Sequence, residues 1–429
     1  MDIRIENTPL SGAVRAISSK SDVHRFLIAA ALSDGCSDIR FTTLSDDIRA
    51  TAGALRALCA DISLCEEADG WHAKIQGNRK KDTPPALFAG ECGTTARLLL
   101  PVAATLYDSC VLDGAPGLRR RPFGPLCAAM RGGDVEVSDD FLPIRCRGRL
   151  KSGVYTIRGD VSSQYISGLL FALPLLTDDS EIRLTTPLAS AGYVDMTLDT
   201  LRRFGIRISQ TDFGYRIPGG QRYRSVTGYT AEGDWSSAGF WLCAGALGGS
   251  VTVTGLPLDS HQRDKNLLAV LAEAGASVCL RADQVTISGA PLTAVSFDGE
   301  DMPDALPVLA AVLATANGVS QVRGGARLKI KESDRLHTTA EMIRALGGGI
   351  ECNSDGFSIR GGPLCGGTCD AANDHRIAMS AAVLATKTAA GAVLRGADAV
   401  AKSYPSFFED FQKLGGKCHV LTDGQTCNS

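Results

Sequence analysis

The sequence predicts an α/β protein of six small repeated units, grouped as two domains of three units each. The length of 429 residues is enough for more than one domain. An amphipathic helix that ends at glycine or a small polar residue and runs into a strand occurs six times, and its stops recur every 67 to 73 residues. A period near 70 is too long for a solenoid unit, so each copy is expected to be a small α/β subdomain.

The six copies follow one another along the chain. They lie at 46–64, 120–137, 193–208, 262–280, 333–351 and 403–420. The third copy shows the helical stripe clearly, with Met196, Leu198, Leu201 and Phe204 at three-and-four spacing. The helices are expected to stop near Asp61, Gly133, Gly205, Gly275, Gly348 and Gly415. Helix, glycine and strand succeed one another in many α/β proteins, and it is the regular spacing that favours a true repeat.

Composition excludes several classes of function. The net charge of -3 gives no basic surplus for nucleic acid, and the longest apolar runs are too short to cross a bilayer. The start lacks the apolar core of a secretion signal, so a cytoplasmic protein is expected. The 14 cysteines lack paired ligand spacing. We interpret them as free thiols and expect no metal and no cofactor.

Hydroxyl and basic residues stand at the expected amino ends of several apolar helices. SSKSDVHRFLIAAAL carries Lys20, Ser21 and Arg25, and AGECGTTARLLL places Gly93 where a ligand can approach the backbone. Arg119, Arg120 and Arg121 precede the second repeat helix, and one of them is expected to face an anion. Ser162, Ser163 and Gln164 open another apolar helix. A simple capping or solvated role is an alternative for each segment.

The densest charge cluster is RLKIKESDR, which leads into the fifth repeat helix. A short strand over Lys329, Ile330 and Lys331 would place both lysines on one face, beside Glu332, whose proton affinity they could tune. A solvated charged turn is the alternative. Arg335 follows directly, NDHRIAMS supplies Arg376 before another buried helix, and Lys402 precedes the sixth repeat helix.

All of these segments are suited to binding an anion. Cations and hydroxyls gather at helix amino ends, whereas no carboxylate cluster suited to Mg²⁺ is present in the sequence. Because this many basic groups around a single phosphate would repel one another, we expect the protein to bind more than one phosphate or carboxylate group.

In this order, the motifs SKS…R, GxxGTxxR, RP, SSQ, MPD, KESDR, DHR and a late AK closely resemble those of the 5-enolpyruvylshikimate-3-phosphate synthase family, over nearly the whole chain. The resemblance implies the enolpyruvyl transferase fold. That fold has two domains of three βαβαββ subdomains, an inside-out α/β barrel that closes over its substrates. It implies a shikimate-3-phosphate domain at 14–229 and a second domain at 1–13 plus 230–429 that supplies much of the phosphoenolpyruvate site. It also implies a monomeric, cytoplasmic, metal-free transferase of the shikimate pathway and a glyphosate target.

The resemblance also carries roles onto individual residues. Asp304 of the MPD motif is implied as the base at the 5-hydroxyl, with Glu332 and Lys20 as candidate acids. Residues implied to bind shikimate 3-phosphate are Lys20, Ser21, Arg25, Ser162, Ser163, Gln164, Ser190, Tyr193, Asp304 and Lys331. Residues implied to bind phosphoenolpyruvate are Lys20, Gly93, Arg121, Gln164, Arg335, Arg376 and Lys402.

Some positions depart from the family pattern. Glu91 stands where the family commonly has asparagine, and its charge should weaken phosphoenolpyruvate binding unless Lys20 or Arg97 pairs with it. Gly117 and Arg327 replace commoner residues, and Cys92 adds a thiol beside Gly93. Two alternatives stay open: a UDP-N-acetylglucosamine enolpyruvyl transferase and a non-catalytic phosphometabolite-binding relative.

Overall fold

The computed structural model describes residues 1–421, which divide into two compact units. The central unit is Ser18–Ala231, and the terminal unit joins Met1–Ile17 to the chain from Glu232 onward. The divisions fall four and two residues from the boundaries given above. Which substrate each unit binds stays a prediction.

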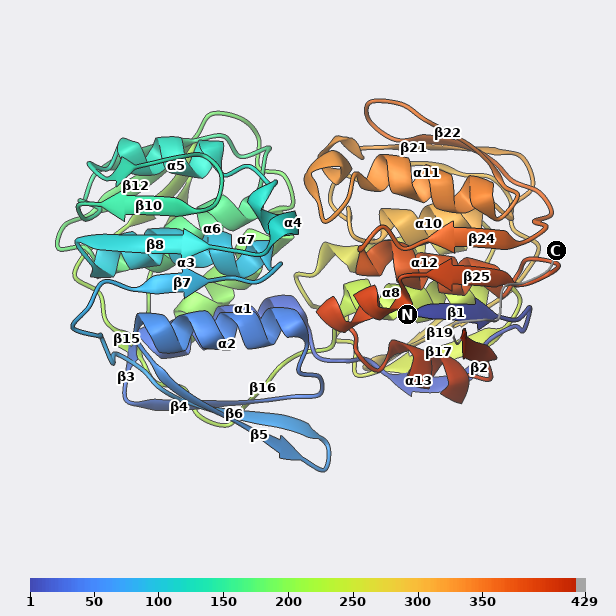
Figure 1. Cartoon of the computed structure of the whole chain (residues 1–429), viewed down its shortest axis with the longest axis horizontal. Helices are drawn as coiled ribbons and strands as arrows, with labels where there is room; N and C mark the ends of the chain where they lie inside the picture. Colours follow the sequence, from blue (N-terminus) through green and yellow to red (C-terminus); the bar gives the residue numbers. More distant parts are fainter. Residues whose placement is uncertain (422–429) are drawn as a thin grey trace. The chain divides into compact units, whose positions relative to one another are not determined.

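Three four-stranded sheets form the framework of the central unit (Figure 1). In spatial order they are β16 (Tyr229–Thr230), β4 (Cys36–Phe41), β6 (Gly70–Gln76), β5 (Asp61–Glu67); β7 (Ala86–Phe88), β8 (Ser109–Asp113), β10 (Ile144–Arg147), β9 (Glu136–Val137); and β11 (Val154–Ile157), β12 (Ser180–Leu184), β14 (Gly214–Ile217), β13 (Ser209–Thr211). A short pair joins β15 (Tyr223–Arg224) to β3 (Ser33–Asp34). The helices are α1 (Lys20–Leu32), α2 (Asp46–Leu58), α3 (Gly93–Leu106), α4 (Pro116–Arg119), α5 (Gly124–Arg131), α6 (Ser163–Ala172), η1 (Leu173–Leu175) and α7 (Ala191–Arg203).

The terminal unit is built in the same way. Its sheets are β2 (Ser11–Arg15), β17 (Ser250–Thr254), β19 (Gln284–Ser288), β18 (Ser277–Arg281); β20 (Ser296–Asp298), β21 (Val319–Arg323), β23 (Phe357–Arg360), β22 (Gly349–Cys352); and β24 (Gly367–Asp370), β25 (Ala392–Arg395), β1 (Asp2–Ile5), β26 (Cys418–Leu421). Its helices are α8 (Trp235–Ala246), η2 (Arg263–Asn266), α9 (Leu267–Glu273), α10 (Leu306–Leu313), η3 (Ala326–Ile330), α11 (Arg335–Ala345), α12 (His375–Ala385), η4 (Ala397–Lys402) and α13 (Phe407–Lys413).

Every four-stranded sheet has one parallel pair at an edge and two antiparallel pairs. The chain order strand, helix, strand, helix, strand, strand confirms the six βαβαββ subdomains. In three sheets an edge or inner strand comes from a distant part of the chain, one of them being β2, which pairs with β17. β16 completes the sheet of β4, and β1 pairs with both β25 and β26. No sheet formed by residues 1–421 closes into a barrel by itself.

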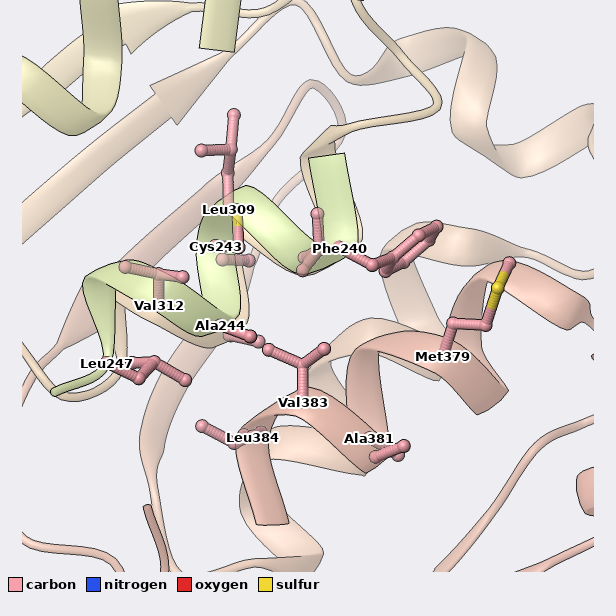
Figure 2. Close-up of a cluster of buried hydrophobic side chains, with 14 of the residues drawn as sticks. Phe240, Cys243, Ala244, Leu247, Leu309, Val312, Met379, Ala381, Val383 and Leu384 are labelled. Atoms are coloured by element: carbon pink, nitrogen blue, oxygen red, sulfur yellow. The ribbon is translucent and has the colours of Figure 1, made fainter. Parts of the chain in front are cut away.

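The buried helices lie inside each unit because they are apolar all round. In the terminal unit every residue of α8, α10 and α12 is buried. Figure 2 shows their side chains packed together, with Phe240 and Ala244 of α8, Leu309 and Val312 of α10, and Val383 of α12 in one cluster. The helices therefore form the core of the unit and hold whatever side chains stand at their amino ends.

The central unit shows the same arrangement with an informative exception. Helices α1, α3 and α6 are buried except at Lys20 and Ser21, at Thr94 and Leu106, and at Gln164. Apart from Leu106, these residues stand in the first helical turn. These half-buried positions of an otherwise buried core include Lys20, Ser21 and Gln164, which were singled out from the sequence.

The glycine stops are confirmed in part. Gly205, Gly275 and Gly415 follow their helices with positive φ angles of 83°, 104° and 89°. In the second repeat the left-handed residue is Asp134, with φ 64°, rather than Gly133. Gly133 serves packing instead, because a Cβ there would lie 2.6 Å from the Tyr155 hydroxyl oxygen.

The expected strand at Lys329–Lys331 is wrong. Residues Ala326–Ile330 form the short helix η3, which buries Leu328 and is closed by a 2.9 Å hydrogen bond from the Leu328 N–H to the Gly325 carbonyl. Burial of Leu328 outweighs the alternating pattern and separates the two lysines. Lys329 is exposed, whereas Lys331 is half-buried.

Candidate active site

Two guanidinium groups meet at the start of α3 in the central unit. A Cβ at Gly93 would lie 3.1 Å from Nη1 of Arg121 and 3.3 Å from Nη1 of Arg97. Both arginine side chains are buried, and Arg97 also donates to the Gln164 amide oxygen at 2.9 Å. Two buried cations at one point repel each other, and a bound anion would relieve this repulsion. A helix amino end with room for a ligand is the expected place for that anion.

Lys20 opens α1 beside this group of residues. Its ammonium lies 2.7 Å from Asp47 Oδ2, and both side chains are nearly buried. Asp47 belongs to α2, which Ser45 caps by accepting the Ile48 N–H. The carboxylate therefore holds Lys20 in place at the helix start.

The structure also gathers three groups able to bind a metal, which sequence spacing could not reveal. Donor atoms of His24, Asp47 and Cys92 lie within 4.8 Å of one another. The Thr51 hydroxyl is 2.7 Å from His24 Nδ1 and fixes the ring. Because the Lys20 ammonium occupies the Asp47 carboxylate, a cation there would have to displace it.

Arg25 does not present its charge at the surface. Its guanidinium is 1% exposed and donates to Thr197 Oγ1 at 2.9 Å and to the carbonyls of Ser21 and Tyr193, both at 2.8 Å. Burial lowers the pKa of Arg25 to about 10. The side chain thus joins α1 to α7 and brings Ser21 and Tyr193 together, which makes it a positioning residue in this structure.

The predicted phosphate-binding serines stand on two adjacent loops. Ser162 caps α6, and Ser190 precedes α7 in the left-handed conformation with φ 54°. The loops are joined because the Ala189 N–H donates to the Gly159 carbonyl at 3.1 Å. Ser162, Ser163 and Ser190 therefore belong to one region of the central unit, whereas Lys331 belongs to the terminal unit.

Glu91 pairs with neither of the cations considered from the sequence. The Gly117 N–H donates to Glu91 Oε1 at 3.0 Å, while Lys20 is held by Asp47 and Arg97 by Gln164. The charge of Glu91 is therefore directed to a backbone amide.

A second cluster surrounds Arg335 in the terminal unit. The guanidinium is 1% exposed and contacts three carboxylates: Asp304 at 2.7 Å, Glu332 at 2.6 Å and Asp374 at 2.7 Å. Asp374 is fully buried, caps α12 through the Arg376 N–H and also accepts from the Ser333 hydroxyl. The carboxylates raise the pKa of Arg335 against the lowering effect of burial, so this cation is permanent.

Asp304 stands just before α10 with 22% of its side chain exposed. Burial raises its pKa, but the charges of Lys331, Arg376 and Arg335 outweigh burial and hold the pKa well below the usual range. Burial lowers the pKa of Lys331, whose ammonium is 3.2 Å from Asp304 Oδ1. Asp304 is therefore ionised at neutral pH, and its side chain remains partly exposed.

Arg376 and Lys402 complete this cluster. Arg376 donates to the Ser236 carbonyl at 2.9 Å and to its hydroxyl at 2.7 Å, and its Nη2 lies 3.8 Å from Asp304 Oδ2. Lys402 donates to the Asn373 carbonyl next to Asp374. The amino ends of α8, α10 and α12 thus converge on one set of charged groups.

The sequence alone did not place Arg97, Asp47 or Asp374 among the binding residues, although Arg97 and Asp374 lie in the GxxGTxxR and DHR motifs. Arg97 lies four residues after Gly93, and this i, i+4 spacing on a helix is the signal that could have included it. The sequence does not indicate which cation Asp47 or Asp374 meets, since their partners Lys20 and Arg335 are 27 and 39 residues away. The carboxylates that hold the cations were therefore missed, while most of the cations themselves were found.

The six subdomains and the cationic helix ends define an α/β enzyme of the enolpyruvyl transferase fold with candidate sites for small anions. The pattern of the family described as EPSP synthase (3-phosphoshikimate 1-carboxyvinyltransferase) matches residues 5–411. The chain belongs to this family.

Relatives and solved structures agree with this assignment. The chain is 38% identical over 428 residues to a 3-phosphoshikimate 1-carboxyvinyltransferase of Clostridium kluyveri, covering 99% of both chains. It is 35% identical to the protein of the same name from Methanocaldococcus jannaschii, covering 96% of this chain and 97% of that protein. An EPSP synthase of Acinetobacter baumannii shares the fold with a TM-score of 0.80 at 24% identity, covering 98% of this chain and 100% of that one. The enolpyruvyl transferase NikO of Streptomyces tendae does so with 0.78 at 20% identity, covering 97% and 98%.

The environment of Cys92 leads to a prediction about its reactivity. Burial raises the pKa of this thiol to about 12, and the Asp47 charge adds to the effect. At pH 8 only about one molecule in ten thousand would carry the reactive thiolate. We expect iodoacetamide to spare Cys92 in the native protein while it alkylates the exposed Cys365, as read by peptide mass spectrometry. Urea should remove the difference; equal native labelling of both thiols would contradict the buried placement.

Proposed function

We propose that the protein transfers the enolpyruvyl group of phosphoenolpyruvate to the 5-hydroxyl of shikimate 3-phosphate and releases phosphate, in the biosynthesis of chorismate and the aromatic amino acids. The observation that carries the proposal is Asp304, an ionised carboxylate beside Lys331, Arg335 and Arg376. A base within a group of cations suits an anionic substrate with a hydroxyl to deprotonate.

The proposed roles follow the two clusters. Ser162, Ser163, Ser190 and Lys331 hold the 3-phosphate, and Ser21 and Tyr193, placed by Arg25, contact the ring. Gly93, Arg121, Lys20 and Gln164, with Arg97 added, take one end of phosphoenolpyruvate; Arg335, Arg376 and Lys402 take the other.

The reaction proceeds in two balanced steps. The 5-hydroxyl oxygen bonds to the central carbon of phosphoenolpyruvate and its proton passes to Asp304, while an acid protonates the methylene carbon. Glu332 and Lys20 are the candidate acids. The tetrahedral intermediate then expels phosphate from the central carbon, and Asp304 returns its proton to this leaving phosphate. The deprotonated acid takes a proton from the new methyl group, which restores the double bond and the acid. The cations stabilise charge on the leaving phosphate without forming bonds to carbon.

Further parts of the proposal concern the setting of the enzyme. Within residues 1–421, no helix has the length and apolar character needed to cross a bilayer. We propose a cytoplasmic monomer that needs neither metal nor cofactor. Gly93 carries no methyl group that would crowd an inhibitor beside phosphoenolpyruvate, so we expect glyphosate to inhibit the enzyme.

The direct test is phosphate release by the purified protein with phosphoenolpyruvate and shikimate 3-phosphate, omitting each in turn and adding no metal. Release that needs both substrates would support the proposal. Phosphate release only with UDP-N-acetylglucosamine would assign enolpyruvyl transfer to that acceptor instead. No phosphate release with either acceptor would favour a non-catalytic binding protein.

A further inference from the structure

Glu91 and Gly117 are matched to each other. The Gly117 N–H donates to the Glu91 carboxylate at 3.0 Å, and both residues are half-buried. A Cβ at position 117 would lie 2.4 Å from Glu91 Oε2 and 2.9 Å from its Cδ. Cβ atoms in proteins essentially never approach non-bonded atoms this closely. The carboxylate can therefore occupy this position only because residue 117 has no side chain.

The backbone around the pair leaves little freedom. The Ala115 N–H donates to the Gly90 carbonyl at 2.8 Å, and a Cβ at Gly114 would lie 2.9 Å from the same oxygen. The loop before α4 is thus fixed against Gly90 and Glu91. A substitution at Gly117 would therefore move the Glu91 side chain more readily than it would move the loop.

The carboxylate is anchored close to the anion site of the central unit. Glu91 stands two residues before Gly93, where the guanidinium groups of Arg97 and Arg121 meet. A carboxylate released from the Gly117 amide would remain tethered beside these cations and would repel an incoming anion. Held on the amide, it leaves the cations to the ligand.

We propose that Glu91 and Gly117 together form an affinity-determining pair: the absence of a side chain at 117 keeps the Glu91 carboxylate on the 117 amide and out of the anion site, and this sets the affinity for phosphoenolpyruvate. The inference rests on the proposed function for the identity of the anion. Glu91 contacts the loop rather than substrate, so it is a positioning residue in this role.

Four proteins separate charge from shape: the wild type, Gly117→Ala, Glu91→Gln, and the double variant. Glutamine has the size of glutamate without its charge, so the new methyl group displaces either side chain. We expect Gly117→Ala to raise KM for phosphoenolpyruvate about tenfold or more, because a like charge within about 12 Å has at least this effect at an effective dielectric constant near 20. KM for shikimate 3-phosphate should not change. The double variant should stay within about twofold of Glu91→Gln.

Gly53→Ala is the matched control, because a Cβ there meets nothing within 4 Å and the residue lies on the exposed side of α2 in the same unit. It should leave KM unchanged. A rise in KM that is the same in Gly117→Ala and the double variant would overturn the proposal, because distortion of the loop would then explain it. No change in Gly117→Ala would overturn it as well.

Calorimetric binding of phosphoenolpyruvate to the same proteins separates this proposal from the proposed function. Tight binding by the wild type and weak binding by Gly117→Ala, without any phosphate release on adding shikimate 3-phosphate, would support the pair and contradict the reaction. Normal turnover with equal binding by all four proteins would support the reaction and contradict the pair.

Discussion

Replacing Asp304 with asparagine should lower kcat for phosphate release by about a thousandfold, within the range that loss of a general base costs. Asparagine keeps the shape of the side chain but cannot accept the hydroxyl proton. Because the change also removes a negative charge 3.2 Å from the Lys331 ammonium, the site becomes more attractive to anions. We therefore expect KM for phosphoenolpyruvate to stay the same or fall. Steady-state kinetics with both substrates varied measures the two effects.

Asp301 offers the matched control for this substitution. It lies in the same loop before α10, but its side chain is exposed. Asp301→Asn should retain the wild-type kcat. If Asp304→Asn kept a kcat within about threefold of the wild type, the carboxylate would not be the base, and Glu332 or Lys20 would have to take both proton transfers.

The repeated fold could be predicted from the sequence because each subdomain carries the same local pattern of residues. The helix of each copy has an apolar stripe, and a stop at a regular interval follows it, as at Gly205 and Gly275. Pairing between distant strands has no such local signal. Nothing in the residues of β1 or β16 indicates that they complete the sheets of β25 and β4, since these partners are some 390 and 190 residues away, respectively.

The candidate site divides along similar lines. Cations and hydroxyls at helix amino ends, such as Lys20 and Ser163, stand out because an apolar helix follows them. Three features could not be read from the sequence: which carboxylate each cation meets, that Arg25 is buried among acceptors, and that Lys329 and Ile330 end a short helix rather than belonging to a strand. All three are set by packing between segments far apart in the chain.

Replacing Arg335 with methionine should have the largest effect on stability of any single charge in the terminal unit. Methionine fills much of the space but leaves the Asp304, Glu332 and Asp374 carboxylates without their shared cation. Asp374 is fully buried, so the penalty falls in the range of about 3–5 kcal/mol known for breaking a buried ion pair. We expect a clear fall in the urea midpoint of unfolding at pH 7. Arg335→Lys keeps the charge, but the lysine side chain cannot reach three carboxylates. Its urea midpoint should therefore lie between those of the wild type and Arg335→Met.

The pH dependence of the stability lost in Arg335→Met tests whether the loss is electrostatic in origin. The cations hold the pKa of Asp304 well below its value in the unfolded chain. A depressed carboxyl pKa stabilises the folded protein above the unfolded pKa of about 3.9, and this contribution is lost as the pH falls through the folded pKa. Without Arg335 the depression is smaller, so the gap between variant and wild type should be widest at neutral pH and narrow below about pH 4.

Arg344 is the matched control for the Arg335 substitution. It lies on the same helix α11, and its exposed guanidinium binds the Ile350 carbonyl at 2.9 and 3.1 Å rather than carboxylates. Arg344→Met should shift the urea midpoint far less, and its effect should not change as the pH is lowered from 7 to below 4. Because an arginine-to-methionine change on one helix is common to both variants, helix propensity and lost packing are similar in the two. If both variants lost the same stability at every pH, the cluster around Arg335 would contribute through packing alone and not through its charges.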